Sequence, residues 1–410
     1  MSVLIRDCRV VTPNGPGPQR GKAMGELEVM PRADVWIEGG VIARVRSHEP
    51  GAASAGVARV IEARGRVLMP GFVDCHTHAC FAGDRLEEWE RRLRGATYQE
   101  ILASGGGIMA TVRAVRGASE GTLREFVAER LASMLAGGTT AVEIKSGYGL
   151  TAADELKMLR ASAAAAAEWA GTVRLTALLG HAMDPAVSPS EYVRRTIHET
   201  LPAIHAEFPG IAVDAFLEAG AWSLADTRKL LSAARGLGHP VRLHADQFTS
   251  MGGVALAAEL GAVSVDHLEA SSPDTLASLA GSGVIGVALP ICGLHLDNRY
   301  ANLRPLIDAG GAGAVATNFN PGSAPSHSMP LAGALAVRRC GLTPAEAITA
   351  TTANAAAVLG FMDRGFIAAG ARADLVLLTH ADERRLWHDL GADAVAMVMS
   401  AGEILRESCA

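Results

Sequence analysis

Eight short apolar runs recur along the middle of the chain, and a longer stretch of helical period separates each from the next. The runs cover residues 68–74, 139–144, 172–179, 212–217, 241–243, 262–265, 284–289 and 313–317. Amphipathic stretches at 122–135, 152–169, 224–237 and 252–260 lie between them. Eight apolar strands alternating with helices are the periodicity of a parallel (β/α)8 barrel. The sequence therefore predicts an α/β fold with a TIM-like barrel.

The segments on either side of this pattern are predicted to form strands rather than helices. Before the barrel, Gly39 and Gly40 separate two β-branched runs and indicate a two-residue hairpin. After it, strand-like alternation returns. We therefore expect residues 1–68 and 366–410 to form the two parts of one small β domain beside a barrel of residues 69–365. Two unconnected β caps are the alternative.

Composition limits the function classes. The chain has 410 residues, 49% of them apolar, which is ample for a large core. Its net charge of −6, without Lys/Arg-rich runs, argues against a nucleic-acid or anionic-membrane partner. No run approaches the ~20 apolar residues of a membrane span. The six cysteines are scattered without a C-x-x-C pair, as free thiols in a reducing compartment are. We expect a cytoplasmic protein.

Polar side chains follow seven of the eight predicted strands. In barrels of this kind the chemistry lies at the C-terminal ends of the strands, because the loops converge there. The residues at these ends are His76 and His78 (first strand), Lys145 and Tyr148 (second), His181 (third), Glu218 (fourth), His244 (fifth), His267 (sixth) and the run NFNPGS from Asn318 (eighth). The sequence therefore predicts one functional site at this rim.

His76 and His78 are the strongest candidates for metal ligands. At a strand end, side chains two residues apart point to the same side, and paired imidazoles suit Zn²⁺ or Fe. His244 is the natural third ligand. Taken alone, a His-x-His pair is more often a hydrogen-bonded strand feature, and a lone His such as His181 or His267 is usually a core residue. The recurrence of histidine at several strand ends favours the metal site.

Two further candidates have ordinary alternatives. Arg85 follows the His-x-His motif and could clamp a substrate carboxylate. It could equally form a surface salt bridge with Asp84 or Glu88. Lys145 and Tyr148 lie in a Gly-flanked turn that could fold over a substrate. The alternative there is a solvated lysine beside a packing tyrosine.

The motifs themselves are familiar. PGFVDCHTHACFAGDR at the start of a barrel, with later histidines after the fifth and sixth strands, resembles the amidohydrolase superfamily. FAGDR, KSGYGL, HADQF, SVDHL and NFNPGS resemble its imidazolonepropionase family in particular. The resemblance implies hydrolysis of 4-imidazolone-5-propanoate, a small molecule with a carboxylate tail, to N-formimidoyl-L-glutamate. It also implies a single Zn²⁺ or Fe ion and a homodimer.

The resemblance assigns roles by position. It implies metal ligation by His76, His78, His244 and the residue at Asn318, substrate contacts by Arg85, Tyr98, Tyr148, His181 and Gln247, and binding of the propanoate end by Asn320, Gly322 and Ser323. It places His267 behind a ligand or against the substrate ring, and we expect catalytic roles for His181, His267 and position 318. His181 is expected to stabilise the developing oxyanion. Lys145 ends the second strand, so it is not the carbamylated lysine of two-metal relatives, and Glu218 stands at the fourth strand end. This favours one metal.

One position departs from the family pattern. The family has Asp directly after the eighth strand, where this chain has Asn318. That Asp is both a ligand and the base for the water proton, and an amide cannot take a proton at neutral pH. Either another group such as His267 substitutes, or the chain is largely inactive. A non-catalytic ligand-binding relative is therefore one alternative. A deaminase of a small heterocycle is another, disfavoured because Gln247 replaces the Glu that such enzymes commonly need.

Overall fold

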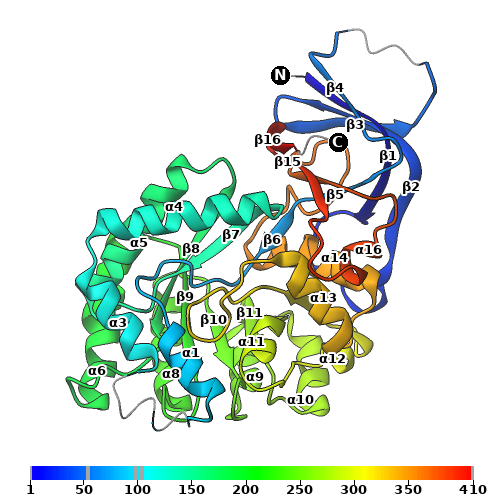
Figure 1. Ribbon diagram of the computed structural model, residues 1–410. Helices are drawn as coiled ribbons and strands as arrows, with labels where there is room; N and C mark the ends of the chain where they lie inside the picture. Colours follow the sequence, from blue (N-terminus) through cyan, green and yellow to red (C-terminus); the bar gives the residue numbers. More distant parts are fainter. Residues whose placement is uncertain (1, 52–55, 97–99, 101–105, 408–410) are drawn as a thin grey trace.

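The computed structural model describes all residues except 1, 52–55, 97–99, 101–105 and 408–410. Its larger part is the predicted barrel of parallel strands (Figure 1). The strands are β6 (Phe72–Asp74), β7 (Thr139–Lys145), β8 (Thr172–Gly180), β9 (Ala212–Leu217), β10 (Arg242–Ala245), β11 (Ser264–His267), β12 (Ile285–Ala288) and β13 (Ala312–Val315). They are hydrogen-bonded in sequence order, which confirms the predicted fold.

The barrel closes between the segments that follow β6 and β13. Thr77 and Phe319 form a parallel bridge just beyond the two strands. The His78 amide donates to the Phe319 carbonyl at 2.9 Å, and the Asn318 amide donates to the His76 carbonyl at 3.0 Å. The seam of the barrel is therefore made by the backbone that carries the predicted metal ligands.

Helices surround the barrel (Figure 1). They are α1 (Leu86–Leu93), α3 (Ile108–Gly117), α4 (Glu120–Ala136), α5 (Ala152–Glu168), α6 (Pro189–Arg195), α7 (Leu201–Glu207), α8 (Leu224–Gly236), α9 (Gly253–Leu260), α10 (Pro273–Ser278), α11 (Pro290–His295), α12 (Arg304–Asp308), α13 (Met329–Arg339), α14 (Pro344–Thr351) and α15 (Ala353–Val358). The four predicted amphipathic stretches are confirmed as α4, α5, α8 and α9. Ser119, Thr151 and Ser223 cap three of them, because each side chain accepts a backbone N–H of the first turn. No helix within the described part of the chain is both long and apolar enough to cross a membrane.

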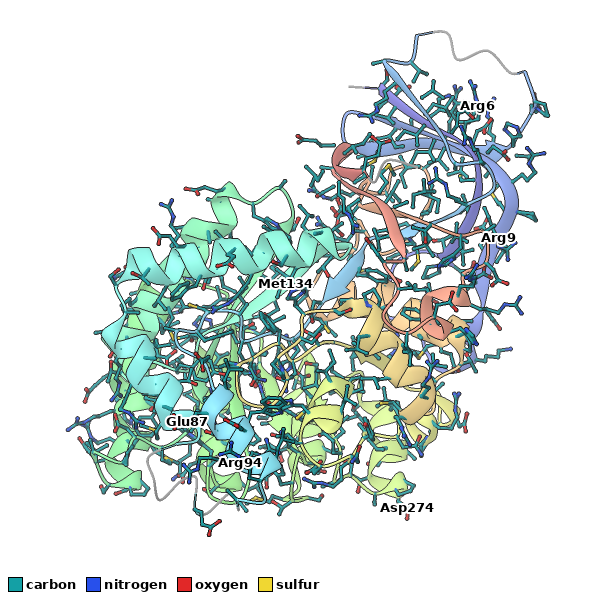
Figure 2. The ribbon with its side chains drawn as sticks, in the orientation of Figure 1. Arg6, Arg9, Glu87, Arg94, Met134 and Asp274 are labelled. Carbon is teal, nitrogen blue, oxygen red and sulfur yellow. The ribbon has the colours of Figure 1, made fainter. Side chains whose placement is uncertain are left out.

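Both ends of the chain join in a second sheet, where Figure 1 marks the two termini. Its strands are β1 (Ser2–Pro13), β2 (Leu27–Glu38), β3 (Val41–Ser47), β4 (Arg59–Glu62), β5 (Val67–Pro70), β14 (Leu375–Leu378), β15 (Val395–Ser400) and β16 (Glu403–Glu407). β14 pairs with β5, so one sheet, and not two unconnected caps, is formed. Gly39 and Gly40 make the predicted hairpin, with φ of 60° and 87°. Arg9, labelled in Figure 2, pairs with Glu383 at 2.8 Å and ties the N-terminal to the C-terminal segment.

The predicted first barrel strand, residues 68–74, is wrong as a single element. Its first part lies in β5 of the terminal sheet and its second part is β6 of the barrel. Gly71 separates them at a crowded point, since an added Cβ would lie 2.4 Å from Thr140 Oγ1. Both strands are buried, so the apolar run continues unbroken from one sheet to the other. The predicted division after residue 68 falls inside β5.

The C-terminal segment also packs onto the barrel helices through Trp387 of α16 (Arg385–His388). The indole Nε1 donates to the Pro344 carbonyl at 3.0 Å. Gly333 of α13 lies under the ring, and a Cβ there would be 2.2 Å from a ring carbon. The contact between these parts of the molecule therefore requires glycine at this position.

Replacing Gly333 with Ala should destabilise the protein by about 1–3 kcal/mol, because the ring of Trp387 must move out of its site. Chemical denaturation followed by circular dichroism measures the change. Gly236→Ala is the matched control, since nothing lies within 4 Å of its added Cβ near the end of α8. Equal stability of the two variants would contradict the proposed importance of this contact.

Candidate metal centre

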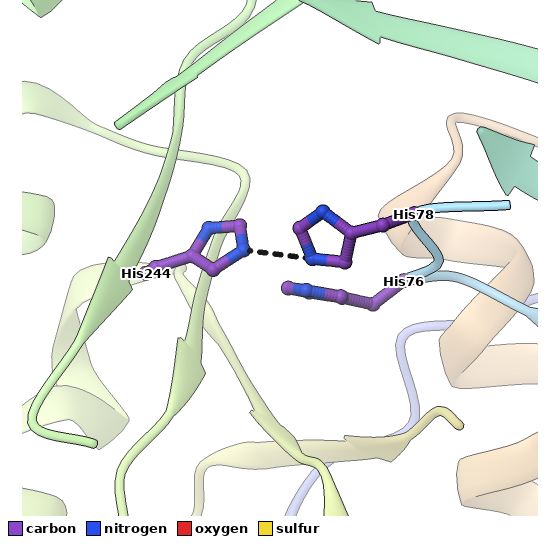
Figure 3. Close-up of side chains that lie close together, drawn as sticks. All are labelled: His76, His78 and His244. Carbon is purple, nitrogen blue, oxygen red and sulfur yellow. Dashed lines mark hydrogen bonds between the residues drawn. The ribbon is translucent and has the colours of Figure 1, made fainter. Parts of the chain in front are cut away.

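Three histidines from distant parts of the chain face one another at the C-terminal rim of the barrel (Figure 3). His76 and His78 follow β6, and His244 lies in β10. The Nε2 atoms of His78 and His244 are 3.5 Å apart. One ring nitrogen from each of the three lies within 4.8 Å of the others. The three rings therefore converge as predicted. All three side chains are also buried.

Carboxylates behind the rings fix how two of these imidazoles are oriented. His76 Nδ1 lies 2.6 Å from Asp266 Oδ2, and His244 Nδ1 lies 3.0 Å from Asp214 Oδ2. In each of these two rings the carboxylate occupies Nδ1, so the other nitrogen, Nε2, is free to face the centre of the cluster. Burial lowers the pKa of His76 and of His78 well below the usual histidine value. The imidazoles are therefore neutral near pH 7, which is the form that binds a metal ion.

The two carboxylates belong to a buried network of five charged side chains. Lys145 Nζ lies 2.9 Å from Glu143 Oε2 and 2.8 Å from Asp214 Oδ2. Arg242 pairs with Glu143 and lies 2.6 Å from Asp266 Oδ2. The side chains of all five are at most 2% exposed. Removal of one partner would leave a buried charge unpaired, so the network holds its carboxylates firmly.

The residues present fit a single metal ion. His76 Nε2 is buried and has no hydrogen-bond partner among the described residues. The same is true of Asn318 Oδ1, whose backbone adjoins that of His76. Three neutral imidazoles and an amide oxygen suit a divalent transition metal better than Ca²⁺ or Mg²⁺, which prefer all-oxygen sites.

His181 and Tyr148 line the same space. The His181 ring stacks on His78 at 5.0 Å between centroids, and Tyr148 lies 6.0 Å from His78. Burial lowers the pKa of His181 to about 3. Its Nδ1 is 3.0 Å from the Gly147 carbonyl, which can only accept, so Nδ1 carries the proton. Nε2 is then an acceptor, which does not suit the expected contact with an oxyanion.

His267 borders the cluster from the other side. Its ring centroid lies 5.9 Å from that of His76 and 5.5 Å from that of His244. Its Nδ1 lies 3.2 Å from Glu269 Oε1, in a buried contact. Gln247 Nε2 lies 3.2 Å from Cys292 Sγ. The structure thus brings His267 to the rim, with Nε2 as the nitrogen not engaged by Glu269.

Arg85 lies beside the turn that follows the eighth strand. Its Nη1 would be 2.9 Å from a Cβ added to Gly322, so the guanidinium lies directly against this turn. Asn320 Oδ1 accepts the amides of Gly322 and Ser323 at 2.8 Å each and shapes this turn. Arg85 also pairs with Glu88, the expected ordinary alternative, at 2.6 Å. Arg85 and residues 320–322 of the turn line a cavity of about 380 Å³, a size typical of small-molecule sites.

Two expectations from sequence need correction. Lys145 is neither solvated nor folded over a substrate, because it is fully buried and ion-paired at the end of β7. Glu218 is not directed at the histidines by any described contact, and it accepts hydrogen bonds from Phe248 and Thr249 instead. It therefore shapes the loop after β10. The predicted substrate contact Tyr98 lies outside the described residues.

The residues that support the site were not predicted from the sequence. Glu143, Asp214, Arg242 and Asp266 are charged positions within otherwise apolar runs, and that contrast was the available signal. Arg130 of α4 was also missed. Its guanidinium donates to the carbonyls of Ala79 and Phe81 at 2.7 Å each and so supports the loop between His78 and Arg85.

Comparisons with known proteins show what this chain is similar to. The profile described as "Amidohydrolase family" matches residues 67–405. The imidazolonepropionase of Deinococcus radiodurans is 47% identical over 394 residues, covering 96% of this chain and 97% of the relative. That of Rubrobacter xylanophilus is 44% identical over 414 residues, covering 98% of each.

Solved structures support the fold at lower identity. Atrazine chlorohydrolase from Arthrobacter aurescens complexed with zinc aligns with a TM-score of 0.68 at 18% identity, covering 99% of this chain and 95% of that one. For 5-methylcytosine deaminase from Klebsiella pneumoniae liganded with 5-fluorocytosine, the TM-score is 0.74 at 16% identity, covering 100% and 98%. These two likenesses concern the fold alone.

Asp266→Asn should weaken metal binding roughly 10–100-fold, because His76 loses the carboxylate that orients its ring. Competition with a chromophoric chelator gives the dissociation constant. Glu218→Gln is the control, as this buried carboxylate contacts no histidine in the described chain. The role assigned to Asp266 fails if both variants bind metal as the unaltered protein does.

Proposed function

Because this chain belongs to the amidohydrolase family and, within it, to the imidazolonepropionases, we propose that it hydrolyses 4-imidazolone-5-propanoate to N-formimidoyl-L-glutamate. It is a metal-dependent hydrolase of histidine degradation that acts on a C–N bond of a cyclic amide. Water adds to the ring carbonyl, and the bond between this carbon and the ring nitrogen breaks. The observation that carries the assignment is the convergence of His76, His78 and His244 at the barrel rim.

His76, His78 and His244 would hold the metal ion, with Asn318 Oδ1 as a weak fourth ligand. When bound, a Zn²⁺ or Fe ion supplies Lewis acidity and lowers the pKa of water to about 7. We favour Zn²⁺ because neutral imidazole ligands of this kind suit it well. Asp214 and Asp266 hold the ligand rings in register, which is a positioning function.

The substrate tail is bound by Arg85 and the turn of residues 320–323. Arg85 brings a guanidinium to Gly322, and both residues line the cavity of about 380 Å³. A guanidinium binds a carboxylate through charge-assisted hydrogen bonds. These contacts orient the ring without taking part in the chemistry. Tyr98 and Gln247 stay predicted substrate contacts.

His181 and His267 would act on protons at the reacting ring. His181 Nε2 is an acceptor, so it suits a ring N–H of the substrate better than a developing oxyanion. His267 has Nε2 available because Glu269 engages its Nδ1. We propose that His267 Nε2 takes the proton of the attacking water, since the amide of Asn318 cannot.

The alternatives are weaker. A deaminase commonly requires a carboxylate where Gln247 stands, and an amide is a poor acid. A non-catalytic ligand-binding protein would need neither the neutral imidazoles nor their supporting carboxylates. We also propose a cytoplasmic homodimer. The five described cysteines, all free buried thiols, are compatible with a reducing compartment, and light scattering would measure the dimer.

Arg85→Ala should raise KM roughly 10–100-fold and change kcat little, because the tail loses its charged partner. Steady-state turnover of 4-imidazolone-5-propanoate gives both constants. Arg94→Ala is the control, since this residue lies at the exposed end of α1 (Figure 2) and pairs with Glu90. An unchanged KM in Arg85→Ala would remove Arg85 from the binding site.

Asn318→Asp tests how far the family base has been replaced. Because His267 is proposed to take the water proton already, a carboxylate there should raise kcat little, whereas a chain without a working base should gain ~10²–10⁴-fold. Turnover of the same substrate is compared before and after the change, with metal content measured in each sample. If the variant gains nothing and the unaltered chain is active, the base is elsewhere, as proposed for His267. If neither turns over the substrate, the proposed function is wrong.

A further inference from the structure

A second cluster of possible metal ligands lies beside the first. His267 at the end of β11, Glu269 just after it and Cys292 of α11 each bring one ligand atom within 4.8 Å of the others. The side chains of His267 and Glu269 are 3% and 4% exposed, and Cys292 is 2% exposed. Apart from the three histidines described above, the described residues hold no further group of this kind.

The carboxylate in this cluster is incompletely satisfied. Glu269 Oε1 contacts His267 Nδ1 at 3.2 Å. Glu269 Oε2 is buried and has no hydrogen-bond partner among the described residues. Its one ion-pair contact in the described chain is with His267. Buried carboxylates are normally paired with cations or coordinate metals, so a carboxylate with one unpartnered oxygen beside an imidazole and a thiol is suited to binding a cation.

The chemistry of the three groups is selective. A thiolate, an imidazole and a carboxylate are ligands of Zn²⁺ and related ions, whereas Ca²⁺ and Mg²⁺ prefer oxygen alone. Cys292 Sγ already accepts a contact from Gln247 Nε2 at 3.2 Å, so a polar side chain reaches the sulfur. Cys292 would release its proton to solvent on binding, and no redox change is involved.

We propose that His267, Glu269 and Cys292 form a second, inhibitory site for a zinc-like divalent cation. The ion would replace the contact between Glu269 and His267 Nδ1, and both groups would become its ligands. His267 would then be unable to serve the reaction at the neighbouring centre. The inhibitory consequence rests on the proposed function, whereas the binding site itself does not.

The other interpretation of the cluster assigns Glu269 only to orienting His267 and Cys292 only to packing. It predicts no thiolate–metal bond. Cys292 therefore separates the two interpretations, because orientation of His267 by Glu269 does not involve the sulfur.

Protein carrying one equivalent of Zn²⁺ is titrated with Co²⁺ and followed by absorption and metal analysis. We expect one further equivalent to bind with a near-ultraviolet thiolate-to-cobalt charge-transfer band, together with loss of turnover. Cys292→Ser should abolish the band and raise the inhibitory Co²⁺ concentration on the order of 10-fold or more, with basal activity kept. Cys8→Ser, a buried thiol of the terminal sheet, should change neither.

Glu269→Gln provides a second test, in which only the number of bound metal equivalents is measured. This variant should also fail to bind the second equivalent of Co²⁺. The proposal is overturned if no second equivalent binds, if it binds without the band, or if the band survives in Cys292→Ser. Binding with the band but without inhibition would overturn the inhibitory role. A protein that fails to turn over the substrate contradicts the proposed function, while the spectroscopic titration still decides the second site.

Discussion

The metal centre depends on a buried ionic network beneath its imidazoles. Lys145 and Arg242 hold Glu143, Asp214 and Asp266 by contacts that exclude solvent. Such a network is costly to bury and costly to break, so its members have little freedom to move. Two of its carboxylates contact imidazole Nδ1 atoms and turn the Nε2 atoms toward the shared centre. Ligand geometry is thus set by charges that never touch the metal.

This network also couples the site to closure of the barrel. Its members come from β7, β9, β10 and β11, whereas His76 and His78 come from the seam after β6. Arg242 reaches that seam directly, since Nη1 donates to the Cys75 carbonyl at 2.9 Å. The three ligands therefore meet only when strands from several parts of the sequence are in register. If these strands were out of register, the three histidines would lie far apart and no metal site would form.

Local patterns in the sequence predicted the position of the site, and prediction failed where a residue's partners are distant along the chain. Strand ends with histidine predicted the rim site, because period and position determine where such side chains lie. Lys145 was misjudged because its glycine-flanked turn looks exposed, whereas its burial depends on Asp214, 69 positions away. Residues 68–74 were predicted as one strand because a single apolar run passes from the terminal sheet into the barrel. Tautomers, such as that of His181, depend on a carbonyl that pattern alone cannot place.

Asn318 changes the charge balance of the centre as well as its proton chemistry. With Asp at this position the cation would have an anionic ligand of its own. Here the expected ligands are three neutral imidazoles and an amide, so compensation must come from the network behind them. That network has three carboxylates against two cations, and its excess negative charge reaches the site through His76 and His244. Metal retention in this chain therefore depends on Asp214 and Asp266 more strongly than in a relative with Asp at position 318, because no carboxylate ligand shares the compensation.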